Sequence, residues 1–545
     1  MKNIVIAISF LTTCFLAGCQ GETSSDSPQT LIDGSEFTRH VSVLAHDSLE
    51  GRMPFTDGES KTITYLSDEF SKLGLRPGNG DSFFQEVPLV EIDSRPAGDL
   101  RVTGKGKALS LKYLDEFVVN SQRMDQVVSL RNSELVFAGY GIIAPEFGWN
   151  DYEGLDVKGK TVVVLVNDPG YADSTLFRGK NMTYYGRWTY KFEEASRQGA
   201  AGVLIVHDTG PASYGWNVVR SSWSGPKLNL QESGGDNPKT LVEGWISMEA
   251  ATKLLEAAGQ PAELFQKASE EGFKAVPLGL SASVTVKNSI KKSVSHNVLG
   301  VWPGTERSDE YIVYMAHWDH LGVGEKINGD SIYNGAVDNA TGVAAILEIA
   351  KAFTQCKSKP LRSILFLAVT AEEQGLLGSA YYAAHPVYPP SRTVAAINID
   401  ALAPFGRTKD VVVVGKGQSE LDEYVEAAAK KQGRYLKPEK NPSAGTYYRS
   451  DHFNFAKIGV PALYTNSGSD LWNGGAEAGE AKHREYDQNK YHAPADNYSP
   501  DWDISGIIED IQLLYEIGDR LSKEDTFPKW KEGSEFKEIR ENTSN

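Results

Sequence analysis

Cysteine is scarce in this chain, which has only Cys14, Cys19 and Cys356 among its 545 residues. Cys14 lies in an apolar N-terminal segment that is expected to be removed, and Cys19 directly follows that segment. Cys356 would then be the one free thiol, which excludes an intramolecular disulfide framework. A chain of this length is long enough for two or three domains, so we expect stability to come from core burial and bound metal.

Positive charge is also in short supply. The chain has 55 Lys and Arg against 72 Asp and Glu, which gives a net charge of −17, and the pI is about 5.2. Its basic clusters are small, such as the pair Lys291-Lys292. Nucleic acid binding needs a basic patch, so we expect no nucleic acid partner. Internal repeats and long low-complexity tracts are absent as well.

The N-terminus carries an apolar run, residues 4–15, behind a single lysine. This pattern is typical of a signal peptide and is too short to span a bilayer as a stable helix. It ends in Leu16-Ala17-Gly18-Cys19, which resembles a bacterial lipobox. We therefore expect residues 1–18 to be a lipoprotein signal peptide, Cys19 to be lipid-modified, and residues 19–33 to be a tether. Ordinary secretion with an incidental Cys19 is the alternative.

Candidate metal ligands follow three apolar segments that are predicted to be β-strands. Residues 311–316 precede a histidine, residues 363–369 precede a Glu-Glu pair, and residues 393–399 precede an aspartate. Such runs suit buried parallel strands, and open α/β sheets build their sites at the C-terminal ends of those strands. Two further candidates lie in loops, one before an amphipathic helix over 343–353 and one near residue 492. The candidate ligands are His317, Asp338, Glu373, Asp400 and His492.

The chemistry of this set points to zinc. Nitrogen and carboxylate ligands without thiolate suit a catalytic zinc, or less often manganese or cobalt. Five ligands are too many for one tetrahedral ion with an open position, but they suffice for two ions about 3.5–4 Å apart. One carboxylate would then bridge the ions, which leaves Glu372 free as a general base. Asp319, two residues after His317, is predicted to orient that imidazole.

Each candidate also has a simpler reading. His317 alone could be an ordinary buried histidine, Asp338 could be the N-cap of the following helix, and Asp400 could end a strand in a turn. The three other histidines near these motifs are weaker candidates, which we expect at the surface or in supporting positions. They are His320, His452 and His483.

In their order, the motifs resemble the dizinc aminopeptidase family, which includes small secreted bacterial aminopeptidases, glutamate carboxypeptidase and the transferrin receptor ectodomain. The resemblance runs from Asn297 to about Leu521 and rests on His317-x-Asp319, the segment 335–342, Glu372-Glu373, Asn398-x-Asp400 and Tyr491-His492. It implies that Asp338 bridges two zinc ions, that His317 and Asp400 complete one site, and that Glu373 and His492 complete the other.

The same resemblance implies roles around the metals. Glu372 would be the catalytic acid and base, Tyr491 would help to polarise the scissile carbonyl, and Arg449 would contact substrate. A cis peptide bond would follow Asp338. Rules for lipoproteins of this kind, applied to Gln20 after Cys19, would place the protein at the outer membrane of a Gram-negative bacterium.

The expected fold is α/β, with a mixed, mostly parallel sheet flanked by helices and an inserted β-rich domain similar to a protease-associated domain. The insert is placed at 125–277, where it would either shape the cleft or serve as a spacer. The catalytic domain would be discontinuous, with residues 34–124 before the insert and 278–522 after it. Residues 523–545 form a charged tail, expected to be loosely attached.

These observations predict an exported aminopeptidase that hydrolyses N-terminal residues from peptides with two zinc ions and a glutamate base. A carboxypeptidase or dipeptidase of the same family is the first alternative. A catalytically silent binding protein, as in the transferrin receptor branch, is the second. A glutaminyl cyclase fits less well, since its single-zinc site does not call for His317. The sequence leaves the oligomeric state open.

Overall fold

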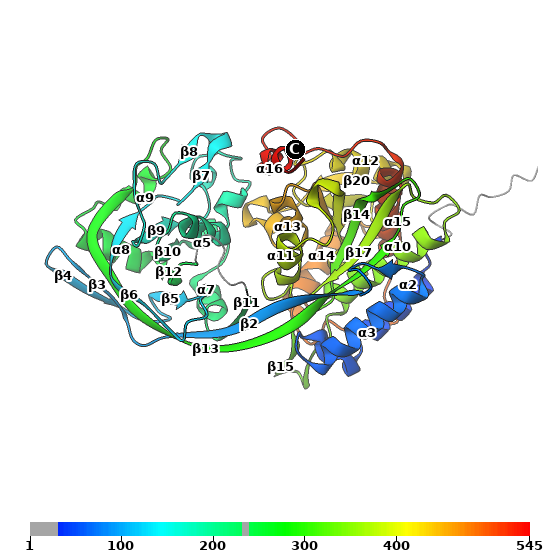
Figure 1. Ribbon diagram of the computed structural model, residues 1–545, viewed down its shortest axis with the longest axis horizontal. Helices are drawn as coiled ribbons and strands as arrows, with labels where there is room; N and C mark the ends of the chain where they lie inside the picture. The colour runs from blue at the N-terminus through cyan, green and yellow to red at the C-terminus, as the bar shows by residue number, and fades with distance from the viewer. Residues whose placement is uncertain (1–30, 232–238, 545) are drawn as a thin grey trace, which may run out of the picture.

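The computed structural model describes residues 31–231 and 239–544. Cys14 and Cys19, and with them the predicted signal peptide and lipidation site, lie outside the described residues. The chain forms two lobes connected by a long antiparallel ribbon of β2 (Phe84–Pro96) and β13 (Val276–Trp302). In Figure 1 this ribbon sweeps along the lower side of the molecule from one lobe to the other.

The larger lobe is built on a mixed sheet. Its strands follow the order β13, β17, β14, β18, β21, and the last four are parallel to one another. A side branch, β19 and β20, joins through an antiparallel pairing with β21. The predicted fold class, a mostly parallel α/β sheet, is therefore confirmed. The bounds are β14 (Arg307–His317), β17 (Arg362–Val369), β18 (Thr393–Asn398), β19 (Asp410–Val413), β20 (Tyr435–Pro438) and β21 (Ala462–Ser467).

Helices cover both faces of this sheet. Alternate strand residues point to opposite faces, so Tyr314 and Phe366 join one core while Met315 and Leu367 join the other. The first core lies under α2, α10, α12 and α15, and the second lies under α11 and α13. The helices are α2 (Gly34–Leu44), α3 (Asp57–Lys72), α10 (Thr341–Gln355), α11 (Leu377–Ala384), α12 (Leu421–Lys431), α13 (His452–Lys457), α14 (Gly475–Asn489) and α15 (Ser505–Lys523).

The smaller lobe has its own core around a second group of parallel strands. Strands β6, β9, β10 and β12 run parallel, and β5 adds an antiparallel edge. Helices α5 and α8 pack beside them (Figure 1). The elements are β3 (Leu100–Gly104), β4 (Lys107–Leu111), β5 (Phe117–Asn120), β6 (Val127–Phe137), β9 (Thr161–Leu165), α5 (Trp188–Arg197), β10 (Gly202–His207), α7 (Trp216–Ser222), β11 (Pro226–Leu230), β12 (Val242–Ser247) and α8 (Met248–Ala257).

This core extends beyond the predicted insert, residues 125–277, at both ends. Leu100 and Val119 on one side, and Val286 on the other, are buried in it. The ribbon strands run without interruption from one lobe into the other, so their alternating pattern contains no local signal of a boundary. Strand β13 alone spans 27 residues.

The C-terminal tail is docked, contrary to the prediction that it would be loosely attached. Trp530 and Phe536 are 4% and 1% exposed, and the Trp530 indole donates to the Gly459 carbonyl at 2.8 Å. The buried Glu535 accepts from the Tyr448 hydroxyl at 2.7 Å and pairs with Arg178 of the smaller lobe at 3.2 Å. The tail thus contacts both lobes. The prediction was wrong because it followed the overall charge of the tail and overlooked two apolar residues, Trp530 and Phe536, that are buried. It ends in α16 (Lys537–Ser544).

Replacing Glu535 with alanine is expected to lower the free energy of unfolding by about 2–3 kcal/mol, because hydrogen bonds to a charged group that reaches both lobes would be lost. Denaturant unfolding measures this change. Glu538→Ala is the control, because Glu538 is exposed on α16. Equal stabilities for the two variants would contradict the role given to Glu535.

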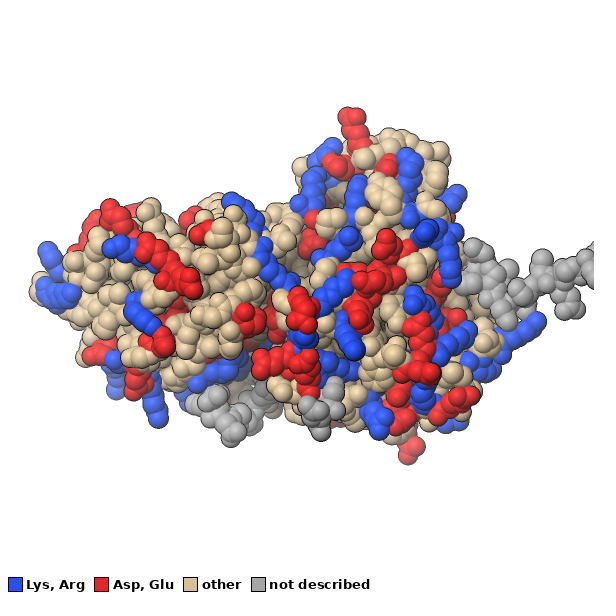
Figure 2. All heavy atoms as spheres, turned by 90° about the horizontal axis from the view of Figure 1, so that it is seen from above, with Lys and Arg blue, Asp and Glu red and all other residues tan. Residues whose placement is uncertain are grey.

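The surface of the described residues is mixed in charge on the face drawn in Figure 2, where acidic and basic side chains alternate over both lobes. The net charge of −17 is therefore spread rather than gathered there. Among residues 31–231 and 239–544, no helix is both long enough and apolar enough to cross a bilayer.

Candidate metal centre

Three of the predicted ligands lie at one edge of the sheet. His317 ends β14, Glu373 follows β17, and Asp400 follows β18. Strand β14 pairs with both β17 and β18 in parallel, so the three C-terminal ends are adjacent. Asp338 lies in the turn just before α10, and the Asp338–Asn339 peptide bond is cis. His492 lies in the loop after α14.

The ligand atoms converge on the two oxygens of Asp338. His317 Nε2 lies 3.2 Å from Asp338 Oδ1 and 3.2 Å from Asp400 Oδ1. On the opposite side, His492 Nε2 lies 3.2 Å from Asp338 Oδ2 and 3.1 Å from Glu373 Oε2. Each carboxylate oxygen of Asp338 therefore faces a different histidine, and each histidine has a second carboxylate of its own.

These spacings fit zinc. With bonds of 2.0–2.1 Å, neighbouring ligands around a tetrahedral ion lie ~3.3 Å apart, close to the separations seen here. His317, Asp338 and Asp400 each offer a donor atom within 4.8 Å of the others. The donor set is nitrogen and oxygen only, as catalytic zinc prefers. The five residues could thus hold two ions, with Asp338 between them.

The electrostatics of the cluster also favour a cation. Burial opposes protonation of His317, but the neighbouring Glu372 and Asp400 outweigh it and hold the pKa of His317 well above its usual value. Burial raises the pKa of Glu372 well above its ordinary range, with His317 acting in the opposite direction. Acidic groups outnumber the histidines here, so the cluster needs positive charge.

The turn that carries Asp338 is fixed by its neighbours. The carboxylate of Asp496 accepts from the backbone N–H groups of Val337, at 3.0 Å, and Asp338, at 3.1 Å. The Asn339 side chain accepts from Gly342 N and donates to the Ile399 carbonyl. Helix α10 begins at Thr341 without a side-chain cap. The alternative interpretation, in which Asp338 is the N-cap of α10, is therefore wrong.

Asp319 acts differently from the prediction. Its backbone carbonyl, not its carboxylate, lies nearest to His317 Nδ1, at 3.1 Å against 3.8 Å. The carboxylate instead accepts from the backbone N–H of Glu372 at 3.0 Å and of Glu373 at 3.4 Å. Asp319 therefore fixes the Glu-Glu turn. Burial raises the pKa of Asp319 to about 7.

Two histidines expected at the surface or in support are fully buried. His320 Nδ1 lies 2.7 Å from Glu373 Oε1, so it supports that ligand while Oε2 faces His492. With Asp338 and Glu373, His320 forms a second group whose donor atoms lie within 4.8 Å of one another. His452 packs edge-on against Tyr447, and burial lowers its pKa to about 3. His483 contacts the Gly468 carbonyl at 3.3 Å.

The remaining predicted site residues of the described chain, Glu372, Tyr491 and Arg449, are all at least partly exposed. Glu372 is half-buried, and its backbone is held by Asp319. Tyr491 is 49% exposed and stacks on His492 with ring centroids 3.9 Å apart. Arg449 is exposed and donates to the Ala444 carbonyl at 2.8 Å. The next residue, Ser450, donates to Asp400 Oδ2 at 2.6 Å, so Arg449 lies one residue from a ligand contact.

Sequence reasoning missed Arg52, which comes from the N-terminal segment. This arginine is 1% exposed and lies beneath the cluster. Its guanidinium donates to the carbonyls of Trp318 at 2.8 Å and Gly335 at 2.9 Å, next to two ligand-bearing loops. It also donates to the carbonyls of Leu44 and Asn334. Nothing local in the segment Leu49-Glu50-Gly51-Arg52 indicates a partner about 270 residues away.

Arg52→Met is expected to lower the free energy of unfolding by about 3–5 kcal/mol, because it leaves buried carbonyls unpaired. Loss of support for the ligand loops should also weaken zinc binding about 10- to 100-fold. Chemical unfolding and chelator competition measure the two effects. Arg52→Lys keeps the positive charge but lacks the planar fork of the guanidinium. Its unfolding free energy and zinc affinity should therefore lie between those of the wild type and of Arg52→Met. Wild-type zinc affinity in the methionine variant would contradict this role.

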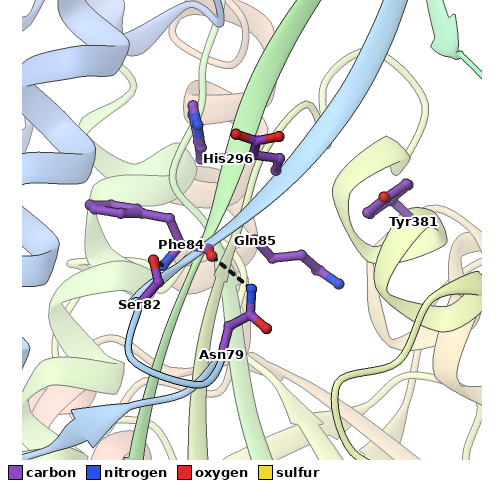
Figure 3. Close-up of a pocket in the computed structure, with 7 residues that line it drawn as sticks. Asn79, Ser82, Phe84, Gln85, His296 and Tyr381 are labelled. Carbon is purple, nitrogen blue, oxygen red and sulfur yellow. Dashed lines mark hydrogen bonds between the residues drawn. The ribbon is translucent and has the colours of Figure 1, made fainter.

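A separate hollow lies where the ribbon enters the larger lobe. Figure 3 shows His296, Phe84 and Gln85 around it, with Tyr381 of α11 at its far side and Asn79 donating to the Phe84 carbonyl at 2.9 Å. None of the predicted ligands lines it, so we assign it no part in the metal chemistry.

Comparison with known proteins supports a peptidase assignment for one part of the chain. Residues 297–515 match the model described as Peptidase family M28. Over 129 residues, the chain is 36% identical to aminopeptidase NAALADL1 of Mus musculus, a match that covers 23% of this chain and 16% of that protein. It is 29% identical over 187 residues to a probable leucine aminopeptidase 2 of Aspergillus oryzae, covering 34% and 31% of the two chains.

Among solved structures, an aminopeptidase from Aneurinibacillus sp. strain AM-1 is similar at 18% identity and a TM-score of 0.46, covering 91% of this chain and 94% of that one. The matched segments span only 16% of the Mus musculus protein and 31% of the Aspergillus oryzae protein. The segment that carries all five predicted ligands, residues 297–515, matches Peptidase family M28.

Proposed function

We propose that the protein is an exported zinc aminopeptidase that removes N-terminal residues from peptides with two zinc ions bound at the cluster. One observation carries the proposal: the two oxygens of Asp338 face His317 and His492, and each histidine has its own second carboxylate. Two-metal hydrolases use such a bridged arrangement. The family match of residues 297–515 supports the same chemistry.

In the proposed mechanism, Glu372 is the proton carrier. Bound zinc would lower the pKa of water, polarise the peptide carbonyl and offset the charge that develops on its oxygen. Glu372 accepts the proton of the attacking water and passes it to the departing amine. Asp319 fixes the backbone of Glu372 for this transfer. Tyr491, which is partly exposed and stacks on His492, would donate a hydrogen bond to the carbonyl oxygen.

We propose that the acidic groups Glu372 and Asp400 hold the free α-amine of the substrate, which would make the enzyme an exopeptidase. Arg449 would contact the substrate beyond the scissile bond. The smaller lobe would act as a protease-associated domain that shapes the cleft. The interface between the lobes supports this role, since Lys457 of α13 pairs with Glu193 of α5 at 2.8 Å.

The place of the protein in the cell is proposed from the sequence. Residues 1–18 would be cleaved, and lipid on Cys19 would anchor the protein to the outer membrane of a Gram-negative bacterium. Mass spectrometry of the mature N-terminus and fractionation of a Cys19→Ser variant test this. The proposal predicts acylated Cys19 and loss of membrane association in the variant. An unmodified N-terminus would contradict it.

The function is tested with a panel of aminoacyl amides and with peptides blocked at either end. Hydrolysis of C-blocked but not N-blocked peptides is expected, together with its loss on chelation and return with zinc. The opposite preference would establish the alternative, a carboxypeptidase. A fully metallated protein that hydrolyses none of these substrates would favour the silent binding protein.

A further inference from the structure

One buried asparagine of the ribbon joins the two ends of the turn that carries Glu372. Asn297 lies on β13 and is fully buried. Its Oδ1 accepts from the backbone N–H of Thr370, which directly follows β17, at 3.0 Å. Its Nδ2 donates to the carbonyl of Gly378, in the first turn of α11, at 2.9 Å. One side chain therefore closes the loop that runs from the end of β17 through both glutamates to α11.

The orientation of the Asn297 amide is fixed by its partners. A backbone N–H can only donate and a carbonyl can only accept, so the amide oxygen faces Thr370 and the nitrogen faces Gly378. Nδ2 also donates to Gln85 Oε1 on the neighbouring strand β2 at 3.0 Å. Gln85 in turn donates to the His385 carbonyl at 2.9 Å, and its side chain extends from the ribbon toward α11 (Figure 3). The ribbon thus holds Asn297 in one orientation.

The turn needs such support because its backbone is strained. Ala371 has a φ of 52°, a left-handed conformation that is unfavourable for any residue other than glycine. Such a conformation persists only where neighbouring contacts enforce it. On one side of Ala371, the Asp319 carboxylate accepts from the N–H of Glu372 at 3.0 Å. On the other side, Asn297 binds Thr370, so the strained residue lies between two fixed points.

Thr370 is held by further contacts. Its carbonyl accepts from the Gly378 N–H at 2.9 Å, and its hydroxyl lies 2.6 Å from that of Ser295, a second residue of β13. A Cβ atom on Gly378 would lie 2.3 Å from the Thr370 carbonyl oxygen and 2.5 Å from Asn297 Oδ1. Glycine is therefore required for this close approach. The ribbon and α11 together fix the point from which the turn begins.

We propose that Asn297 is a positioning residue for Glu372, which fixes the turn so that the carboxylate meets the attacking water in one geometry. This inference rests on the proposed peptidase function and adds a residue to its machinery. A misplacement of about 1 Å at a reacting group can lower the rate about 10²-fold, even when the mutation is far from the chemistry. Asn297 acts through the turn and is not expected to touch the substrate.

Asn297→Ala is expected to lower kcat about 10- to 100-fold, while KM stays within about twofold and the zinc content stays at the wild-type level. The rate is measured with the aminoacyl amide that the wild type hydrolyses fastest and is expressed per zinc-loaded, folded chain, so partial loss of folded protein cancels. Wild-type kcat in this variant would overturn the assignment. Loss of zinc would also overturn it, because the role would then be to hold metal.

Asn288→Ala is the matched control. Asn288 is another buried asparagine of β13, in the part of the strand next to the smaller lobe. Its amide is also bonded at both ends, since it accepts from Ser94 Oγ and donates to the Asp125 carbonyl, each at 2.8 Å. The control should therefore lose stability as Asn297→Ala does but keep the wild-type kcat. An equal fall in kcat in both variants would overturn the assignment.

A double variant separates positioning from general structural support. If Asn297 acts through Glu372, adding Asn297→Ala to Glu372→Gln should change kcat by less than about threefold, because the proton carrier is already lost. A further 10- to 100-fold fall in the double variant would show that Asn297 acts by another route and would overturn the assignment.

Gln85→Leu keeps the experiment decisive if Asn297→Ala does not fold. The leucine leaves Asn297 in place and removes only one acceptor of its Nδ2 group, so kcat should fall about three- to tenfold. Wild-type kcat in Gln85→Leu would then overturn the assignment and leave the peptidase function standing. Hydrolysis of no peptide or aminoacyl amide by the zinc-loaded wild type would overturn both.

Discussion

Replacing Asp338 with alanine is expected to empty both metal positions at once and abolish hydrolysis. The reason is geometric: its two oxygens lie 3.2 Å from His317 Nε2 and 3.2 Å from His492 Nε2, so one side chain would serve two ions. Metal analysis of the purified variant against the wild-type protein measures the effect. We expect close to two zinc ions per chain in the wild type and close to none in the variant.

His492→Ala provides the comparison. His492 faces only the side of the cluster that Glu373 completes, so its loss should leave the ion held by His317, Asp338 and Asp400. About one zinc per chain is therefore expected in that variant. Two ions retained in the Asp338 variant would contradict the bridging role.

Glu372→Gln is expected to slow turnover by about 10²–10⁴, the usual contribution of a general base. Gln keeps the shape of the side chain, but it cannot take the proton of water or pass it on. The metals should remain, because Glu372 is not one of the five proposed ligands. Steady-state kinetics and metal analysis of the same preparation separate the two effects.

Glu325→Gln is the control for that variant, since Glu325 is an exposed acid on strand β15 (Gly322–Ile327), and its activity should match that of the wild type. Near-normal turnover of a fully metallated Glu372→Gln variant would show that another group carries the proton.

Much of the larger lobe could be predicted from the sequence because its signals are local. The apolar runs before His317, Glu372 and Asp400 correspond to β14, β17 and β18, and the parallel pairing of these strands follows from their burial on both faces. Residues at their C-terminal ends had to be neighbours. The predicted helix over 343–353 is α10, which extends to 341–355.

The parts that could not be predicted depend on contacts between distant segments. Arg52 donates to backbone carbonyls about 270 residues further along the chain. The Asp319 carboxylate accepts from the backbone N–H of Glu372, in the turn that follows β17. His320 shares its short loop with His317, but no sequence pattern says which histidine faces a metal and which supports a carboxylate. The burial of Trp530 and Phe536 could not be predicted, because charged residues separate them in the sequence.

X-ray diffraction from zinc-loaded crystals at the zinc absorption edge tests most directly whether two cations are held on either side of Asp338. The predicted result is two anomalous peaks about 3.5–4 Å apart. One should lie beside His317 and Asp400 and the other beside His492 and Glu373, each within bonding distance of one Asp338 oxygen. A single peak at this cluster, or peaks located elsewhere in the fold, would contradict a two-zinc site bridged by Asp338.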